Sequence, residues 1–301
     1  MATSPLKPLR GVRVLSLSLN LPGPAALMRC RQMGATCVKL EPPPPQGAPA
    51  GSSGDPMAQY SAKTYADLHA GVRTVQADLK TEKGQKVLHR ELAKADVLLT
   101  SFRPSALTKL GLVWKTLHKQ YPTLSQVAIV GAPGERAEEP GHDLTYLADN
   151  DLITGLDLPP TLYADMGGAM MASEAVLQAV LHQRSASKAK GQFVEVALSE
   201  AARWLALPRA WGLTLPGSAI GGAHAGYQVY PCKNGRVAVA ALEPHFAASL
   251  CAAVGVPVTS AKTLLAPATR ATIAAWLLTQ TRKQLDALAV ARDIPLHTLP
   301  P

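Results

Sequence analysis

The stretch GVRVLSLSLNLPGPAALMRCRQMGATCVKLEPP (residues 11–43) decides the predicted fold. Residues 11–19 are rich in valine and leucine, which is typical of a strand that is mostly buried. After the loop NLPGP, the pattern predicts a helix over residues 25–35 that ends at Gly34, and then a second strand at 36–43. A strand, a helix and a strand within about 30 residues indicate a β-α-β unit, which begins a parallel sheet. The unit lacks the GxGxxG pattern of dinucleotide-binding proteins.

The same alternation continues along the chain. Further strands are predicted at 73–79, 95–102, 125–131 and 192–198, and further helices at 81–94, 105–110, 113–120, 166–184 and 199–213. This order predicts a doubly wound, Rossmann-like α/β domain built on a parallel sheet. Ligands of such sheets bind beyond the carboxyl ends of the strands. We therefore expect one crevice among the loops at 20–24, 41–45, 101–104 and 131–142.

A second, smaller α+β domain is predicted after the Gly-rich run PGSAIGGAHAG (216–226). Residues 227–242 read as a hairpin around Asn234-Gly235, the strongest short hairpin signal in the chain. Helices are expected at 244–254, 268–279 and 282–290. The predicted organisation is a large domain at 1–200, a linker at 201–225 and a small domain at 226–301.

Composition limits the classes of function. The chain is 47% hydrophobic and 17% charged, as globular proteins are, and no apolar run is long enough to cross a membrane, so no membrane partner is expected. The net charge of +9 suits an anionic ligand. Because the basic residues are scattered and only 5% of residues are aromatic, we expect a phosphate-bearing small molecule and no nucleic acid. The four cysteines form no CxxC pair, which indicates reduced thiols in a cytoplasmic protein.

The stretch GHDLTYLADNDLITGLDLPPTLYADMGG (141–168) carries the candidate chemistry. His142 and Asp165 lie 23 positions apart, each at the edge of a predicted helix, so they can converge on one atom. On the residues alone, Asp165 is more often the N-cap of the helix that follows, and a lone histidine is more often structural. Gly167-Gly168 would let a ligand approach the backbone there. Asp143 has no companions at metal-ligand spacing, so no metal site is predicted.

Two other charged residues also have two interpretations. Glu243, between Leu242 and Pro244, either starts a helix or belongs to the site. Arg103 follows a predicted parallel strand, so it is either a surface charge or a ligand for phosphate.

Longer motifs resemble a known family. They are DLKTEKGQKVL (78–88), ADVLLTSFRPSALTKLGL (95–112), GHDLTYLA (141–148), ADMGGAMMASEAVLQAVL (164–181), KGQFVEVALSEA (190–201), GGAHAGYQVYPCKNGRVAVAALEPHF (221–246) and LTQTRKQLDAL (278–288). In this order they resemble the class III CoA-transferase superfamily (CaiB/BaiF type) and, through GHDxxY and ALEPxF, its α-methylacyl-CoA racemase branch. The resemblance implies a racemase or epimerase of 2-methylacyl-CoA thioesters. His142 and Asp165 would be opposed proton carriers, and Glu243 would support His142.

The resemblance also implies an acyl-CoA substrate that carries its own CoA, with no separate cofactor, and a homodimer. The residues assigned to CoA binding are Lys39, Arg73, Ala77, Asp78, Leu79, Arg103, Gly141 and Tyr146. Two departures from the family are visible. Pro42 stands where relatives often have arginine, so either CoA affinity is lower or Lys39 or a neighbouring base substitutes; and the chain ends at Pro301 without the C-terminal return segment of the family.

Two other functions remain open. A class III CoA-transferase would use Asp165 as a nucleophile, pass through an aspartyl-CoA thioester and have no need of His142. A truncated, non-catalytic paralogue would bind CoA without exchanging the α-proton.

Overall fold

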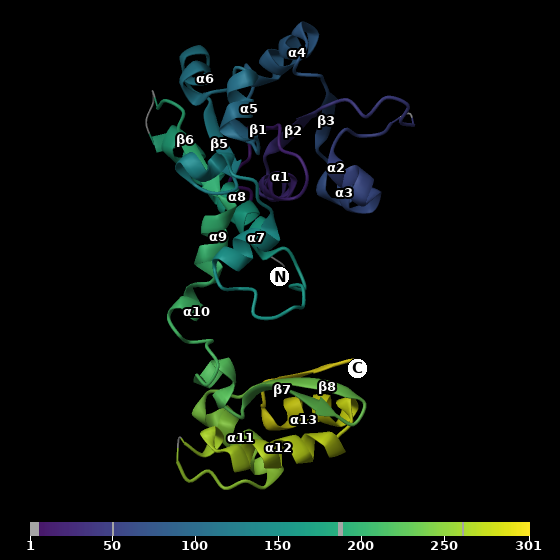
Figure 1. Cartoon of the computed structure of the whole chain (residues 1–301), viewed down its shortest axis with the longest axis vertical. Helices are drawn as coiled ribbons and strands as arrows, with labels where there is room; N and C mark the ends of the chain where they lie inside the picture. Colours follow the sequence, from purple (N-terminus) through teal and green to yellow (C-terminus); the bar gives the residue numbers. More distant parts are fainter. Residues whose placement is uncertain (1–5, 50, 186–188, 261) are drawn as a thin grey trace. The chain divides into compact units, whose positions relative to one another are not determined.

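The computed structural model describes residues 6–49, 51–185, 189–260 and 262–301. The chain divides into two compact units, Met1–Ala206 and Leu207–Pro301 (Figure 1). Residues 201–205, predicted as linker, continue a helix of the first unit, and the Gly-rich run belongs to the second.

The first unit is built on a six-stranded sheet in the order β3-β2-β1-β4-β5-β6, and every neighbouring pair is parallel. Its strands are β1 (Arg13–Ser16), β2 (Thr36–Glu41), β3 (Arg73–Gln76), β4 (Val97–Thr100), β5 (Ser125–Val130) and β6 (Phe193–Ala197). The strand order reverses between β1 and β4, which makes a topological switch point there. The predicted doubly wound α/β fold is confirmed.

Helices cover both faces of this sheet. They are α1 (Pro22–Gln32), α2 (Pro56–Tyr60), α3 (Ala62–Leu68), α4 (Glu82–Leu92), α5 (Pro104–Lys109), α6 (Trp114–Gln120), the 3-10 turn η1 (Gly134–Glu138), α7 (Asp143–Asp149), α8 (Tyr163–Ser185) and α9 (Leu198–Leu205). Val14 of β1 packs into the core with α1 and α8, whereas the next residue, Leu15, packs into the core with α4 and α6. Both faces of β1 are therefore buried, as is usual for a central strand of a parallel sheet.

Local capping chemistry explains where several helices begin. Thr81, the predicted N-cap of α4, accepts a hydrogen bond from the Gly84 N–H at 3.0 Å. Asp55 and Ser61 cap α2 and α3 in the same way, although neither helix was predicted. Both lie just after the Pro- and Gly-rich segment, where five- and seven-residue helices leave too short a periodic pattern to be read.

The second unit contains a three-stranded antiparallel sheet in the order β7-β8-β9, with helices packed on it. Its elements are α10 (Leu207–Ala210), the irregular turn η2 (Ala219–Ala223), β7 (Tyr227–Cys232), β8 (Gly235–Ala240), α11 (Pro244–Val254), η3 (Thr263–Leu265), α12 (Pro267–Thr279), α13 (Arg282–Arg292) and β9 (Leu296–Leu299). The hairpin is confirmed with one correction: its loop residues are Lys233 and Asn234, since Gly235 already pairs with Cys232. β9 was not predicted, because a four-residue segment between prolines gives almost no strand signal.

The described residues hold neither a candidate membrane span nor a candidate metal site. Within the described ranges no helix is both long and apolar enough to cross a membrane. Nor do His, Cys, Asp and Glu side chains there gather in groups of three or more that would hold a metal ion. The four cysteines are buried thiols.

Candidate active site

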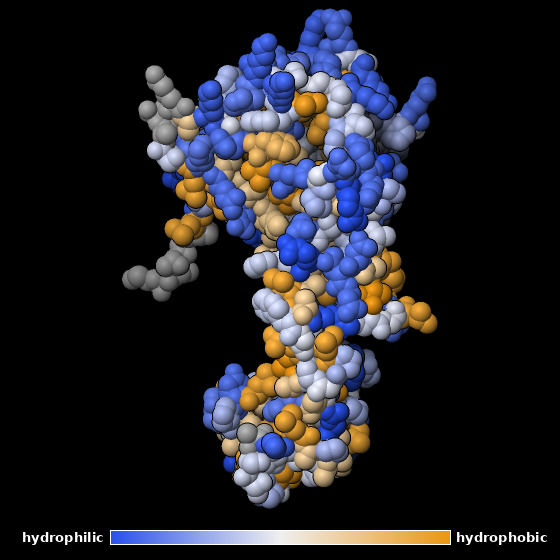
Figure 2. Space-filling view, turned by 60° about the vertical axis from the view of Figure 1, so that its left-hand side comes forward, coloured by the Kyte–Doolittle hydropathy of each residue, from blue (hydrophilic) through white to orange (hydrophobic). Residues whose placement is uncertain are grey.

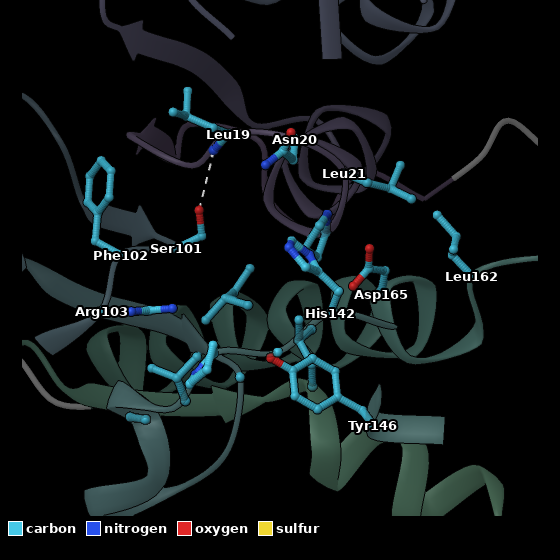
Figure 3. A pocket seen from close by; sticks show the side chains of 18 of the residues that line it. Leu19, Asn20, Leu21, Ser101, Phe102, Arg103, His142, Tyr146, Leu162 and Asp165 are labelled. Atoms are coloured by element: carbon cyan, nitrogen blue, oxygen red, sulfur yellow. Dashed lines mark hydrogen bonds between the residues drawn. The ribbon is translucent and has the colours of Figure 1, made fainter. Parts of the chain in front are cut away.

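A cavity of about 560 Å³ opens in the first unit at the switch point of the sheet (Figure 3). The loop after β1 and the loop after β4 form one part of its wall, and a hydrogen bond of 3.3 Å from the Leu19 N–H to Ser101 Oγ joins these loops. The chain after β5, the beginnings of α7, α8 and α9, and Met57 and Tyr60 of α2 form the rest. Three of the four loops that were expected around one crevice, 20–24, 101–104 and 131–142, therefore contribute to the cavity.

His142 lies at the N-cap of α7, with an extended backbone and an exposed side chain that lines the cavity. Its N–H donates to Thr145 Oγ1 at 3.1 Å, and that hydroxyl donates to the carbonyl of His142 at 2.7 Å. These bonds hold the backbone of the turn and leave the imidazole unengaged by the cap. The imidazole is thereby presented to the cavity on a fixed main chain.

Asp165 lies in the first turn of α8, and its half-buried side chain lines the same cavity. The interpretation of Asp165 as an N-cap is wrong, because α8 begins at Tyr163, three residues earlier than predicted. Burial raises the pKa of the Asp165 carboxyl from 3.8 to about 6; the neighbouring charge of Asp143 adds to this rise, and His142 opposes it. A carboxyl with such a pKa exchanges a proton near neutral pH.

Asp143 is a functional residue that the sequence interpretation missed. It is buried, and its Oδ1 accepts a hydrogen bond of 2.9 Å from the backbone N–H of Asp165. The carboxylate thus joins the first residue of α7 to the first turn of α8. The N-terminal ends of helices favour negative charge because of the helix dipole. Because Asp143 adjoins His142 in sequence, this one bond sets the two candidate proton carriers side by side, as Figure 3 shows for His142 and Asp165.

The glycines of the ADMGG motif have a packing role instead of the expected ligand contact. A Cβ atom on Gly168 would overlap the side chain of Leu198, where α8 crosses α9. One on Gly167 would touch Leu205 and Ala201 of the same helix. Close approach of two helices, and not of a ligand, therefore requires small residues here.

Gly141, Tyr146 and Arg103 also line the cavity. Side chains on Gly131 or Gly141 would collide with the Tyr146 ring, so these two glycines make room for a buried tyrosine. Arg103 is exposed and precedes α5, at the end of the loop after β4. Its guanidinium is the cation that the cavity offers to an anionic ligand, as Figure 3 shows beside Phe102.

The assignment of Lys39 to CoA binding is corrected by the structure. Its side chain is fully buried, and its amine pairs with Asp55, lies 2.9 Å from His69 Nε2 and 3.5 Å from Glu41 Oε2. A buried ammonium group needs such partners to offset its desolvation. Lys39 is therefore an internal ion-pair residue and has no free charge for a phosphate.

Four other residues assigned to CoA lie apart from this cavity. Arg73, on the edge strand β3, pairs with Glu91 at 2.5 Å, and Ala77, Asp78 and Leu79 follow that strand. None of them is among the described residues that line the cavity. Their contact with CoA stays a prediction.

Glu243 belongs to the second unit, where it is the exposed N-cap residue of α11. The interpretation that it starts a helix is confirmed. Its support of His142 stays a prediction.

Comparisons with known proteins place the chain among CoA enzymes. The model of CoA-transferase family III matches residues 9–299. The chain is 35% identical over 166 residues to the cinnamoyl-CoA:phenyllactate CoA-transferase of Clostridium sporogenes, covering 52% of this chain and 40% of that protein. It is 30% identical over 264 residues to the α-methylacyl-CoA racemase of Mus musculus, covering 82% of this chain and 65% of that one. The matched region is thus about half the length of such relatives.

Solved structures with the same fold lead to the same family. A crystal structure of a hypothetical protein from Mycobacterium tuberculosis superposes with a TM-score of 0.80 at 25% identity, covering 97% of this chain and 85% of that one.

Proposed function

The chain belongs to CoA-transferase family III, as its motifs predicted, and we propose that it is a racemase of 2-methylacyl-CoA thioesters. The family contains both racemases and CoA-transferases at similar identity to this chain, so membership alone does not select the reaction. The observation that carries the proposal is the pairing of His142 with Asp165 in one cavity, close enough for His142 to affect the pKa of Asp165.

Racemisation needs two groups that exchange protons with the same α-carbon. In one direction the Asp165 carboxylate removes the α-proton, and the electron pair of the C–H bond moves onto the thioester oxygen to give an enolate. The His142 imidazolium then protonates the other face of the carbon, and the carbonyl re-forms. In the reverse direction the roles exchange. A carboxyl whose pKa is about 6 suits both parts, because it is readily populated in both forms near neutral pH.

Arg103 supplies the proposed contact to CoA. An arginine beyond the carboxyl end of a parallel strand suits a phosphate group, and its guanidinium shares the cavity with the two proton carriers. CoA then enters as part of the substrate, and the proposed reaction needs no separate cofactor.

A CoA-transferase is the second candidate, and one observation favours it. Asp165 alone would be its nucleophile, and the cavity presents that carboxyl to a ligand. The carboxylate would attack the acyl thioester to give a mixed anhydride and release the CoA thiolate. The thiolate would next attack the aspartyl carbonyl and release the carboxylate of the acyl donor, which leaves an aspartyl-CoA thioester.

A homodimer is the proposed assembly. Apolar side chains are exposed on the first unit, and Figure 2 shows hydrophobic areas between hydrophilic ones on the side that it presents. Met170 of α8 and Trp204 of α9 are exposed to 56% and 68%. Exposed apolar clusters commonly mark association surfaces. Sedimentation of the wild-type chain and of Met170→Glu tests this: a monomeric wild type contradicts the proposal.

One incubation separates the candidate functions. A single enantiomer of a 2-methylacyl-CoA is kept in deuterated water with the protein, and deuterium content and optical purity are followed together. Deuterium entry with loss of optical purity is expected for a racemase. Mass spectrometry that finds a CoA adduct on Asp165, together with an active His142→Ala variant, would establish the transferase instead. CoA binding without exchange would indicate the non-catalytic paralogue.

A further inference from the structure

Asn20 is a polar residue of the cavity wall that has no role in the proton transfers proposed above. It follows β1 at the switch point and lines the same cavity as His142 and Asp165. Figure 3 shows its side chain in the wall above His142, with Leu19 and Leu21 on either side. It is therefore a polar side chain between two apolar ones in this part of the wall.

The backbone of Asn20 is held in an uncommon conformation. Its φ angle is 62°, in the left-handed region that is uncommon for residues other than glycine, although asparagine is enriched there. The Asn20 N–H donates to Asp55 Oδ1 at 3.0 Å, and the same oxygen accepts from the Met57 N–H at 2.9 Å. Asp55 is fully buried and pairs with the equally buried Lys39. The hydrogen bond to buried Asp55 thus holds the left-handed backbone of Asn20 in place. Backbone held in such uncommon conformations is frequent at functional sites.

The Asn20 amide is left without a protein partner. Its Oδ1 is closed off from solvent, and no donor in the described part of the chain reaches it. The structure gives the Nδ2 group no hydrogen bond to those residues either. The two N–H bonds of Nδ2 therefore remain available for an acceptor atom of a ligand in the cavity. Because Oδ1 is enclosed, Nδ2 is the end that a ligand reaches.

The proposed reaction needs a donor of this kind. Negative charge develops on the thioester oxygen as the α-proton leaves, and a preplaced N–H group stabilises it. A neutral amide does so without adding a positive charge beside Asp165. A cation there would favour the ionised carboxylate and weaken Asp165 as a base.

We propose that Asn20 donates a hydrogen bond from Nδ2 to the thioester carbonyl oxygen of the bound acyl-CoA and stabilises the enolate. This inference rests on the proposed acyl-CoA function. Asn20 keeps its proton throughout: the C–H electron pair moves onto the oxygen when His142 or Asp165 takes the α-proton, and it returns to carbon on reprotonation.

The test uses Asn20→Gly, because glycine adopts the same left-handed backbone and removes only the amide. Asp293→Gly is the matched control: Asp293 is also left-handed, with a φ of 51°, but lies in the second unit. Two quantities are measured for each full-length variant. One is the rate of α-proton exchange in deuterated water. The other is the affinity ratio between a 2-methylacyl-CoA thioester and the matching CoA thioether, which has a methylene in place of the carbonyl.

We expect Asn20→Gly to slow exchange by about 100- to 1,000-fold. It should also abolish the preference for the thioester while leaving thioether affinity unchanged. Retention of either exchange or preference in Asn20→Gly overturns the proposal, as does a wild-type protein that shows no preference for the thioester. A wild type that prefers the thioester but exchanges no proton, with the preference lost in Asn20→Gly, upholds the contact and refutes the racemase.

Discussion

Replacing Asp143 by asparagine should make the site active at lower pH. The introduced amide oxygen would still accept the hydrogen bond from the Asp165 N–H, so the geometry is kept while the charge is removed. That charge is the second largest cause of the raised pKa of Asp165, after burial. The pKa of Asp165 in Asp143→Asn should therefore fall below 6 and, because burial persists, stay above 3.8.

The size of the effect follows from ionised fractions. With a pKa of about 6, roughly 9% of Asp165 is ionised at pH 5, and a pKa restored fully to 3.8 would ionise roughly 94%. Exchange that uses Asp165 as the base can therefore accelerate at pH 5 by at most about tenfold. Well above pH 6 no acceleration is expected, because the carboxyl is already ionised and a lower pKa makes it a weaker base.

The assay is the initial rate of deuterium entry into each enantiomer of a 2-methylacyl-CoA, followed from below to above pH 6. The enantiomer whose α-proton faces Asp165 should show an acid limb centred near 6 in the wild type and at lower pH in Asp143→Asn. Asp149→Asn is the control, since Asp149 is an exposed carboxylate on the same helix, paired with Arg136 at 3.5 Å. A midpoint that does not move in Asp143→Asn, or that moves equally in Asp149→Asn, refutes the reasoning.

Three further outcomes are expected. His142→Ala should lose racemisation by about 100- to 10,000-fold yet retain exchange of one enantiomer, and Asp165→Ala should retain exchange of the other; equal exchange of both enantiomers by either variant contradicts the two-carrier mechanism. The pKa of Asp165 is raised on folding, so its contribution to stability is full below 3.8 and is lost as pH rises through about 6. Asp165→Asn should therefore increase the free energy of unfolding above pH 6 by up to about 3 kcal/mol and give no such gain below 3.8, as urea titrations at the two pH values would show. Gly168→Ala should destabilise by about 1–3 kcal/mol, because its Cβ would lie 2.2 Å from the Leu198 side chain; Gly167→Ala, whose Cβ would lie 3.3 Å from the end of the Leu205 side chain, should cost clearly less in the same titration, and equal losses would contradict the packing argument.

The order of strands and helices could be predicted because both faces of the sheet are covered. Burial on two sides leaves apolar runs such as residues 97–99 of β4, whereas a one-sided sheet would alternate. Short elements escaped prediction: α2 and α3 contribute five and seven residues, and β9 only four. Their placement depends on tertiary contacts that no local period records.

Within the site, the sequence identified candidate residues but not the long-range contacts that their side chains make. His142 and Asp165 were singled out from their motifs, and the structure brings both to one cavity. Lys39 was misassigned because its partner Asp55 lies 16 residues away, in a loop that has no periodic pattern. Asp143 was passed over because its role is a hydrogen bond to a residue 22 positions later, which only the packed helices reveal.

The bond from Asp143 to the Asp165 N–H has a consequence for how such enzymes diversify. The spacing of the two proton carriers is set by this cross-helix contact, and not by the length of the connection at 150–162. That connection carries the exposed Leu156 and Leu158 and ends at Leu162 in the cavity wall. On the proposed function, a change in the length or sequence of this connection would alter the acyl pocket while the two proton carriers keep their separation. The segment that selects the substrate and the contact that spaces the carriers would then vary independently.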